Sequence, residues 1–180
     1  MFLFVGRVVR DKGVEELVTA FTKLAKDHPK ARLLMVGDYE LELDPLSPEV
    51  DDAIRNHPGI TEAGWVSDVC PYMALSHCFV LPSYREGLSN SLIEVGLMGL
   101  PSIATDINGC NEVIVPGDNG DLVPKKDAVA LEAAMRRMIE DPSYRETLQR
   151  KSRESIASRF AQAEYFWPEL MKVYEGFLAE

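Results

Sequence analysis

The sequence predicts a doubly wound α/β domain: a parallel, Rossmann-like sheet with helices on both faces and a helical tail at the end of the chain. Short apolar runs alternate with amphipathic segments along the whole sequence, which is the order of βαβ units. Several of these runs are apolar throughout, as expected of parallel strands that are covered on both faces. The 180 residues suffice for one domain with a buried core.

Six short segments, several of them continuous apolar runs, are the expected strands. In chain order they are residues 2–5, 32–36, 59–62, 78–81, 102–104 and 120–123. Ligands of such sheets bind beside the carboxyl ends of the strands. A site is therefore expected in the loops after the first, second, fourth and fifth strands.

The amphipathic segments are the expected helices. In the first one, apolar residues recur at helical spacing. They are Val14, Leu17, Val18, Phe21 and Leu24. Pro29 ends this helix, and Ser67 is expected to cap another helix that has Pro71 in its first turn. An amphipathic helix is expected after Glu86, and the acidic stretch 39–48 is expected to form a surface loop. Three further helices are expected at 127–140, 142–158 and 162–178.

Composition and motif content narrow the class of protein. An apolar share of 46% excludes a disordered chain. The formal net charge of −10 argues against a nucleic-acid partner, because nucleic acid requires a basic face. The three cysteines form no C-x-x-C pair, which favours a reduced cytoplasmic setting. The sequence contains no zinc-binding motif, no D-x-D and no P-loop, so no metal is expected.

The loop after the first strand combines cations with glycines. It is Gly6-Arg7-Val8-Val9-Arg10-Asp11-Lys12-Gly13. Arg7 can bind a phosphate through two hydrogen bonds, and Lys12 adds a point charge. An ordinary polar loop that turns at its glycines has the same composition, so the loop alone leaves both interpretations open.

The segment from Glu86 to Glu94 is the most informative part of the chain. Glu86 is expected in the loop that ends the fourth strand, and Glu94 in the first turn of the next helix. Gly87 lets a ligand approach the backbone, and the helix start offers unpaired N–H groups to an anion. Two carboxylates around an anion-binding backbone suit a ligand with hydroxyls on both sides of a phosphate, such as a nucleotide sugar.

Simpler interpretations of these loops stay open. Ser91 and Glu94 fit a capping box, in which Glu94 only closes the helix start. Glu86 can be a solvated loop acid paired with Arg85. The loop 105–112, after the fifth strand, can line a pocket or can be an Asn-Gly turn followed by a helix cap.

In combination, the motifs resemble those of a known family. They are Gly6-Arg7 with Lys12-Gly13, the two glutamates with seven residues between them, and residues 99–106 and 119–123. In this order they resemble the retaining GT-B glycosyltransferases of family 4. They match only the C-terminal, donor-binding half, over residues 2 to about 178. Residues 83–87 and 106–112 resemble the subgroup that builds capsular and O-antigen polysaccharides. Members often have Gly-Phe-Gly after the first glutamate, where this chain has Gly87-Leu88-Ser89.

The resemblance implies roles for individual residues. Arg7 and Lys12 would hold the diphosphate, and with Glu86, which would face the donor sugar, they are the expected catalytic residues. Glu94 would accept hydrogen bonds from the ribose hydroxyls. The other implied donor-binding residues are Gly6 and Gly87, Leu88 and Ser89 at the phosphate, and Trp65 and Val66 at the base. No cofactor and no metal are implied, because cations and backbone amides would stabilise the leaving diphosphate.

The implied activity is transfer of a sugar, with retention, from a nucleotide-diphosphate sugar such as a UDP-sugar to a polysaccharide or lipid-linked acceptor. Residues 1–180 would form the donor-binding domain, with the N-terminal acceptor domain absent, since the chain opens directly on a strand without a leader. The chain alone is expected to be inactive, and the intact enzyme is expected in the cytoplasm or at the inner face of the membrane. A GT-B nucleotide-sugar epimerase and a non-catalytic nucleotide-binding module are the alternative functions.

Overall fold

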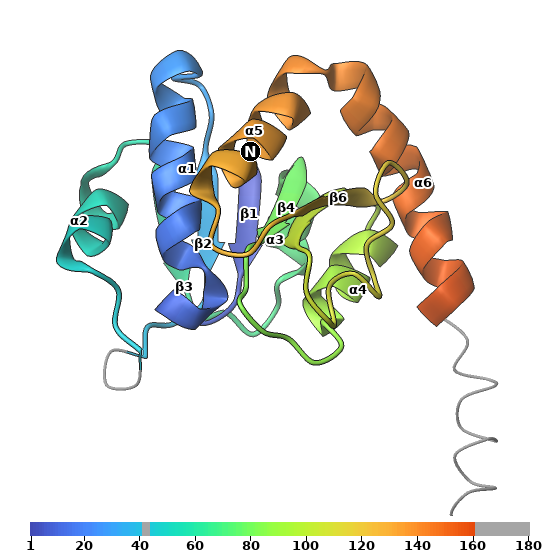
Figure 1. Cartoon of the computed structure of the whole chain (residues 1–180), viewed down its shortest axis with the longest axis horizontal. Helices are drawn as coiled ribbons and strands as arrows, with labels where there is room; N and C mark the ends of the chain where they lie inside the picture. Colours follow the sequence, from blue (N-terminus) through green and yellow to red (C-terminus); the bar gives the residue numbers. More distant parts are fainter. Residues whose placement is uncertain (41–43, 161–180) are drawn as a thin grey trace, which may run out of the picture.

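A six-stranded sheet forms the centre of the structure, a computed structural model that describes residues 1–40 and 44–160 (Figure 1). The strands are β1 (Phe2–Val5), β2 (Leu33–Val36), β3 (Ile60–Gly64), β4 (Cys78–Leu81), β5 (Ser102–Thr105) and β6 (Gly120–Val123). They lie in the order β3-β2-β1-β4-β5-β6, and every pair of neighbours is parallel. The predicted doubly wound sheet is confirmed, and each predicted strand is present with bounds shifted by at most two residues.

Helices cover both faces of the sheet (Figure 1). They are α1 (Val14–Asp27), α2 (Pro48–Asn56), α3 (Cys70–Leu75), α4 (Asn90–Leu97), α5 (Ala128–Glu140) and α6 (Pro142–Phe160), with a short 3-10 helix at Arg10–Lys12. Successive strand residues point to opposite faces, so β1 divides its side chains between two buried clusters. Phe2 and Phe4 pack with Phe21 of α1 in one cluster. Leu3 packs with Leu92 of α4 in the other, so α1 and α4 cover opposite faces.

Two helices differ from the prediction. The sequence pattern does not predict α2, because its residues are mostly polar and Ile54 is the one buried residue in it. Helix α3 begins at Cys70, so the prediction that Ser67 caps it is wrong, although Pro71 lies in its first turn as predicted. Asp68 Oδ1 accepts a hydrogen bond from Cys70 N at 2.9 Å. The acidic side chain, closer to the helix start, satisfies the N–H group that Ser67 was expected to bind.

The two long helices near the end of the described chain match the prediction. Asp127 Oδ1 accepts hydrogen bonds from the N–H groups of Val129 and Ala130 and so caps the start of α5. Helix α6 begins two residues after α5 ends. The helix predicted at 162–178 lies outside the described residues. None of the helices within 1–40 and 44–160 is both long and apolar enough to cross a membrane.

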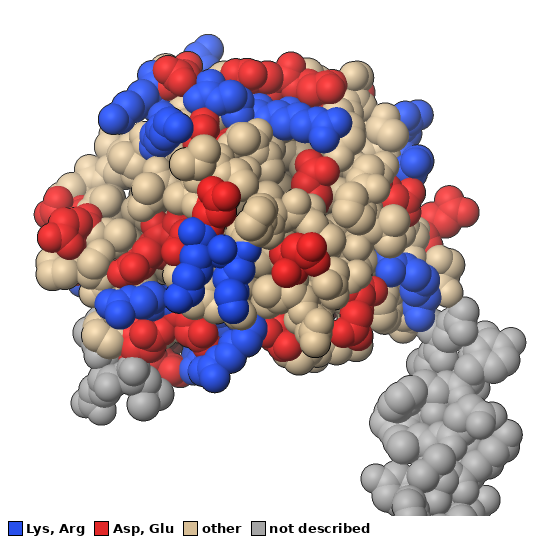
Figure 2. All heavy atoms as spheres, in the orientation of Figure 1, with Lys and Arg blue, Asp and Glu red and all other residues tan. Residues whose placement is uncertain are grey.

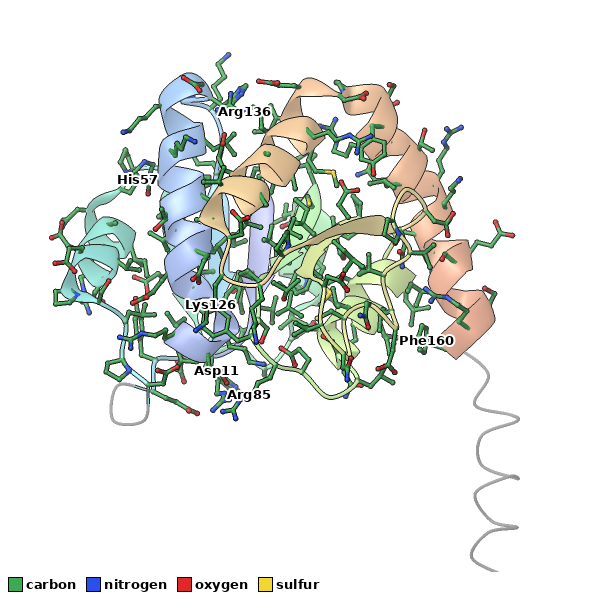
Figure 3. All side chains as sticks on the ribbon, in the orientation of Figure 1. Asp11, His57, Arg85, Lys126, Arg136 and Phe160 are labelled. Atoms are coloured by element: carbon green, nitrogen blue, oxygen red, sulfur yellow. The ribbon has the colours of Figure 1, made fainter. Side chains whose placement is uncertain are left out.

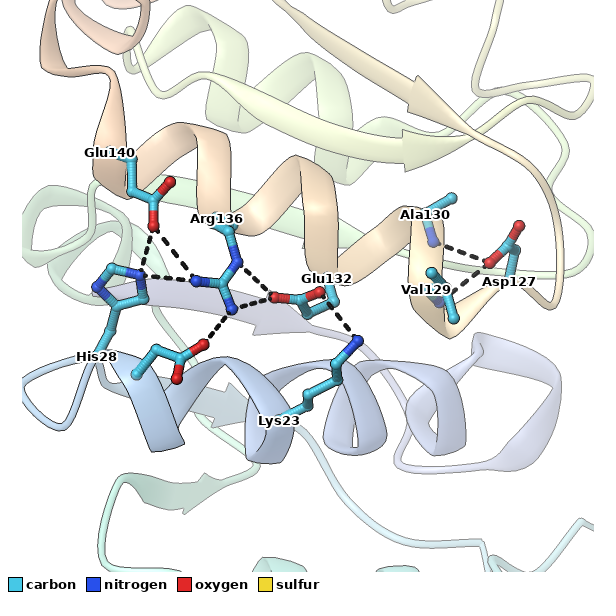
Figure 4. A network of polar contacts seen from close by, with 9 residues as sticks. Lys23, His28, Asp127, Val129, Ala130, Glu132, Arg136 and Glu140 are labelled. Carbon is cyan, nitrogen blue, oxygen red and sulfur yellow. Dashed lines mark hydrogen bonds and ion pairs between the residues drawn. The ribbon is translucent and has the colours of Figure 1, made fainter.

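Charged residues join α1 to α5 near the amino edge of the sheet (Figure 4). Arg136 donates from Nη2 to Asp27 Oδ2 at 2.7 Å and from Nε to Glu132 Oε1 at 2.8 Å. The buried Glu132 carboxylate also lies 3.4 Å from Lys23 Nζ, so two cations balance its charge. This network fixes the two helices at one end of the sheet and leaves the loops of the carboxyl edge free to form a site.

Candidate functional site

Loops that follow β1, β4 and β5, three neighbouring strands, meet at the carboxyl edge of the sheet. The first two loops are in direct contact, because Tyr84 N donates to Asp11 O at 2.8 Å. Gly13 permits this approach, since its φ is 69° and a side chain on it would run into the carbonyl oxygen of Pro82. The loop that carries the predicted cations and the loop that carries Glu86 therefore lie side by side.

Lys12 and Glu86 form the central contact of this edge. Lys12 Nζ donates to Glu86 Oε1 at 2.6 Å. The two side chains are 19% and 13% exposed, so water screens this pair less than it screens a surface ion pair. Arg85 Nε instead donates to Asp11 Oδ2 at 2.8 Å. The interpretation of Glu86 as a solvated acid paired with Arg85 is therefore wrong.

Arg7 lies at an open pocket of about 460 Å³. The pocket is lined by Arg7, Val9, Asp11, Glu40, Asp44 and Arg85. The Arg7 guanidinium is about half exposed and donates to Glu40 Oε2 at 2.6 Å. Figure 3 places Asp11, Arg85 and Lys126 at one end of the molecule. In Figure 2, Lys and Arg side chains near this end are bounded on both sides by acidic ones, so positive and negative charges alternate around the edge.

Glu94 occupies a different position from the predicted one. Helix α4 begins at Asn90 with Ser89 as its N-cap, so Glu94 lies in the second turn and not in the first. The capping-box interpretation is wrong for the same reason, because Ser91 lies inside the helix. The Glu94 side chain is exposed, and its carboxylate makes no hydrogen bond or ion pair with another described residue. It is therefore available to a ligand.

The third loop supports the segment that follows Glu86. Gly109 has a φ of 83°, and a side chain on it would run into the carbonyl oxygen of Gly87. Ser89 N donates to Gly109 O at 3.3 Å, so this amide is already engaged. The Leu88 N–H donates to no other described residue. Of the two amides predicted at a phosphate, that of Leu88 is the available one.

Polar side chains of the third loop bond to the loop itself. Asn111 Nδ2 donates to Asp106 Oδ1 at 2.9 Å, and Gly109 N donates to Glu112 Oε1 at 3.2 Å. Residues 108–113 form turns. These contacts favour the Asn-Gly turn over a loop whose polar side chains line a pocket.

Trp65 and Val66 lie at the same edge but follow β3, two strands away from β1. Trp65 is 70% exposed, and its N–H donates to Asp38 Oδ1 at 3.1 Å. Gly6 lies at the end of β1, where its N–H donates to Val36 O at 2.9 Å. The loop predicted to hold the base is thus on the outer flank of the edge, with β2 between it and the cations.

Two residues that the sequence did not single out complete the edge. Tyr84 OH donates to the Glu16 carboxylate at 2.7 Å, and burial together with this hydrogen bond raises the pKa of Tyr84. Lys126, in the loop after β6, places Nζ 4.6 Å from the centroid of the Tyr84 ring, close enough for a cation–π interaction. The sequence offered one signal for Lys126. Lys125 and Lys126 are consecutive lysines after the sixth strand, and that strand ends at the same edge of the sheet.

Cys110 lies at this edge in the loop after β5. Burial, with a contribution from the charge of Glu86, raises the pKa of Cys110 to about 12, so the thiol stays protonated near neutral pH. Within the described ranges, no three His, Cys, Asp or Glu side chains gather where they could hold a metal ion. Binding without metal stays a prediction.

Comparison with known proteins assigns the chain to a family. The sequence profile of the family described as glycosyl transferases group 1 matches residues 1–141. The chain belongs to this family. The predicted resemblance to glycosyltransferases is confirmed. A relative, the capsular polysaccharide biosynthesis glycosyltransferase CapM of Staphylococcus aureus, is 30% identical over 98% of this chain and 46% of CapM.

Solved structures share the fold. Sucrose-phosphate synthase from Thermosynechococcus elongatus matches with a TM-score of 0.81 and 27% identity, over 99% of this chain and 45% of the synthase. HepE of Anabaena, in a complex with UDP, matches with a TM-score of 0.80 and 21% identity, over 88% of this chain and 44% of HepE. This member of the glycosyl transferases group 1 family therefore spans less than half the length of these relatives.

Proposed function

We propose that the chain is the donor-binding half of a retaining glycosyltransferase that transfers a sugar from a UDP-sugar to a polysaccharide or lipid-linked acceptor. The contact between Lys12 and Glu86 carries the proposal. It joins a cation suited to phosphate to a carboxylate suited to sugar hydroxyls, at the edge where doubly wound sheets bind ligands. Membership in the family, the UDP bound to HepE and the similarity to CapM support it.

Donor binding exchanges the partners of the charged residues. The diphosphate takes Lys12 from Glu86 and Arg7 from Glu40, and the freed Glu86 carboxylate accepts hydrogen bonds from the donor sugar. As the bond to the anomeric carbon breaks, negative charge develops on the leaving diphosphate. The two cations and the Leu88 N–H then stabilise that charge, which lowers the barrier if they are positioned before the reaction.

The other predicted residues bind the rest of the donor. Glu94 has no partner among the described side chains and accepts from the ribose hydroxyls. The backbone of Trp65 and Val66 holds the base. Gly6 and Gly87 let the diphosphate approach the main chain, and Ser89 fixes that segment through its hydrogen bond to the third loop.

The acceptor is bound by a second domain, which residues 1–180 do not contain. The chain aligns with less than half the length of each relative, which supports this part of the proposal. Binding and transfer need no metal. The intact enzyme works in the cytoplasm or at the inner face of the membrane.

Calorimetry with UDP, GDP and UDP-glucose tests the proposal. The chain should bind a nucleoside diphosphate equally well with EDTA and with Mg²⁺. Lys12→Ala should weaken binding by about 1.5–3 kcal/mol, the size of a hydrogen bond to a charged group. Lys30→Ala, an exposed lysine far from this edge, is the matched control and should bind as the parent does. Absence of binding to UDP and GDP would overturn the donor function, and strict dependence on Mg²⁺ would overturn the metal-free mechanism.

The two alternative functions predict other outcomes. Conversion of UDP-GlcNAc without any acceptor would favour the epimerase. Nucleotide binding without transfer, even when the acceptor half is supplied in trans, would favour a binding module. Transfer by residues 1–180 alone would show that no second domain is required.

A further inference from the structure

A second pocket lies at the amino edge of the sheet, at the end away from the donor site. Its volume is about 470 Å³, which is within the range of small-molecule sites. It forms where the starts of β1 and β4 meet the ends of α1 and α5 and the first turn of α6. In Figure 3, Arg136, whose partner Asp27 lines this pocket, lies at the opposite end of the molecule from Asp11.

Apolar side chains form the floor of the pocket. Phe2, Cys78 and Met138 line it and are 3%, 1% and 1% exposed. Ala31 and Ile139 add apolar walls. Burial raises the pKa of the Cys78 thiol, so the thiol stays protonated and neutral. A ligand gains free energy here by burying an apolar body.

Arg145 adds a positive charge that forms no ion pair with a carboxylate of the described residues. Its Nη1 donates to Met138 O at 2.9 Å and so stabilises the last turn of α5. No carboxylate of another described residue forms an ion pair with this guanidinium. Arg145 and His77 both line the pocket, and the Arg145 charge contributes, after the Met1 ammonium and burial, to lowering the pKa of His77.

The other ionisable groups that line the pocket do not pair with Arg145. Asp27 is its one carboxylate among the described residues, and it is held by Arg136 at 2.7 Å. His28 Nε2 lies 3.0 Å from Glu140 Oε1. Lys30 also lines the pocket and forms no ion pair with a described residue. The pocket therefore combines an apolar floor with a net positive rim.

We propose that this pocket binds a small organic anion with an apolar body, such as an aromatic carboxylate or sulfonate. The anionic group binds Arg145, whose planar guanidinium suits such oxyanions. The apolar body packs on Phe2 and Met138. The site does not share a residue with the donor site, and the proposal does not depend on the proposed function.

Two fluorescent dyes that differ by one sulfonate group test the proposal on the unaltered chain. Anilinonaphthalene sulfonate carries the anion, and phenylnaphthylamine is the same ring system without it. The sulfonate should bind about tenfold more tightly at low salt, the size of one hydrogen bond to a charged group. Amide chemical shifts of Phe2, Ala31 and Ile139 should move on titration. Equal affinity for both dyes, or shifts confined to other surfaces, would overturn the proposal.

Variants then test whether Arg145 supplies the positive charge that binds the sulfonate. Arg145→Met should weaken the sulfonate about tenfold and leave phenylnaphthylamine within about twofold of the parent, and Arg145→Lys should restore most of the loss. Arg150→Met, on the same helix and exposed, is the matched control and should change neither affinity. Unchanged sulfonate binding in folded Arg145→Met would overturn the assignment.

Two further measurements separate this site from the donor site and from the chain terminus. Saturating UDP should not displace the sulfonate dye, and displacement would place the dye at the donor edge instead. Two residues added before Met1 move the terminal ammonium away from His77, to whose Nδ1 it lies 3.2 Å. The affinity should stay within about twofold, and a loss similar to that of Arg145→Met would assign the charge to the terminus.

Discussion

The exchange of partners at the donor site can be tested through Lys12 and Glu86. Their hydrogen bond is 2.6 Å long, and the side chains are 19% and 13% exposed. Exposed pairs are worth about 0.2–1 kcal/mol, and breaking a fully buried pair costs about 3–5 kcal/mol. A pair of intermediate burial should therefore show a coupling free energy of about 1–2 kcal/mol.

A double-mutant cycle with Lys12→Met, Glu86→Gln and both changes measures this coupling by urea unfolding. Each single change should destabilise the chain, and the double variant should lose less than the sum. With a urea slope of about 1–3 kcal/mol per molar, the midpoint shifts are resolvable. The exposed pair Arg55 and Asp51 is the control cycle, with a coupling too small to resolve. A Lys12–Glu86 coupling below about 0.3 kcal/mol would refute the reasoning.

The Glu86→Gln variant also shows whether loss of the Lys12–Glu86 pair tightens or weakens nucleotide binding. UDP must separate Lys12 from Glu86 if the cation binds phosphate. Glu86→Gln removes the competing charge and should tighten UDP about three- to tenfold, which corresponds to about 0.7–1.4 kcal/mol. UDP-glucose should gain less or lose affinity, because the carboxylate that binds the sugar is gone. Weaker UDP binding by this variant would mean that Glu86 still holds Lys12 in the complex.

Further predictions concern three other positions. Glu94→Ala should weaken UDP by about 1.5–3 kcal/mol without changing the melting temperature, since the carboxylate has no described partner; a lower melting temperature with unchanged affinity would contradict its role at the ribose. Gly109→Ala should destabilise the chain by at least about 1–3 kcal/mol in urea, because of its left-handed backbone and the contact with Gly87; a stability equal to the parent would show that the loop adapts. The pKa of Asp27 is lowered, first by its hydrogen bond from Arg136, so its stabilisation is present above the ordinary carboxyl value of about 3.9 and is lost as pH falls below it. Asp27→Asn should therefore melt below the parent at pH 7, and the difference should shrink as the pH falls below the ordinary carboxyl value; a constant difference would refute the linkage.

The inner strands of the sheet were predictable because they are buried on both faces. In β1 and β4, nearly every residue is buried, so the runs are visible in the sequence without any knowledge of their neighbours. Helix α2 was not predictable in this way, since only Ile54 is buried in it. The cap of α3 was wrong because Ser67 and Asp68 are both good acceptors, and only the backbone path decides which one faces Cys70 N.

The contact between Lys12 and Glu86 could not be predicted without knowing the order of the strands in the sheet. Lys12 and Glu86 are 74 positions apart, and the sequence places both at carboxyl ends without saying that β1 and β4 are neighbours. Their adjacency arises because the chain reverses its direction of travel across the sheet after β3. Such a reversal opens a crevice between the loops of the two strands on either side of it.

The carboxylate partner of each cation also decides how Arg7 and Lys12 can act. Arg7 and Lys12 follow the same strand, and the sequence assigns both to phosphate. In the structure Arg7 is half exposed beside Glu40, whereas Lys12 is largely buried against Glu86. Removing Lys12 therefore leaves a poorly hydrated carboxylate, whereas removing Arg7 leaves one that water can solvate. On a chain with a net charge of −10, the proposed mode of binding exchanges these carboxylates for an anionic donor and does not require a site of excess positive charge.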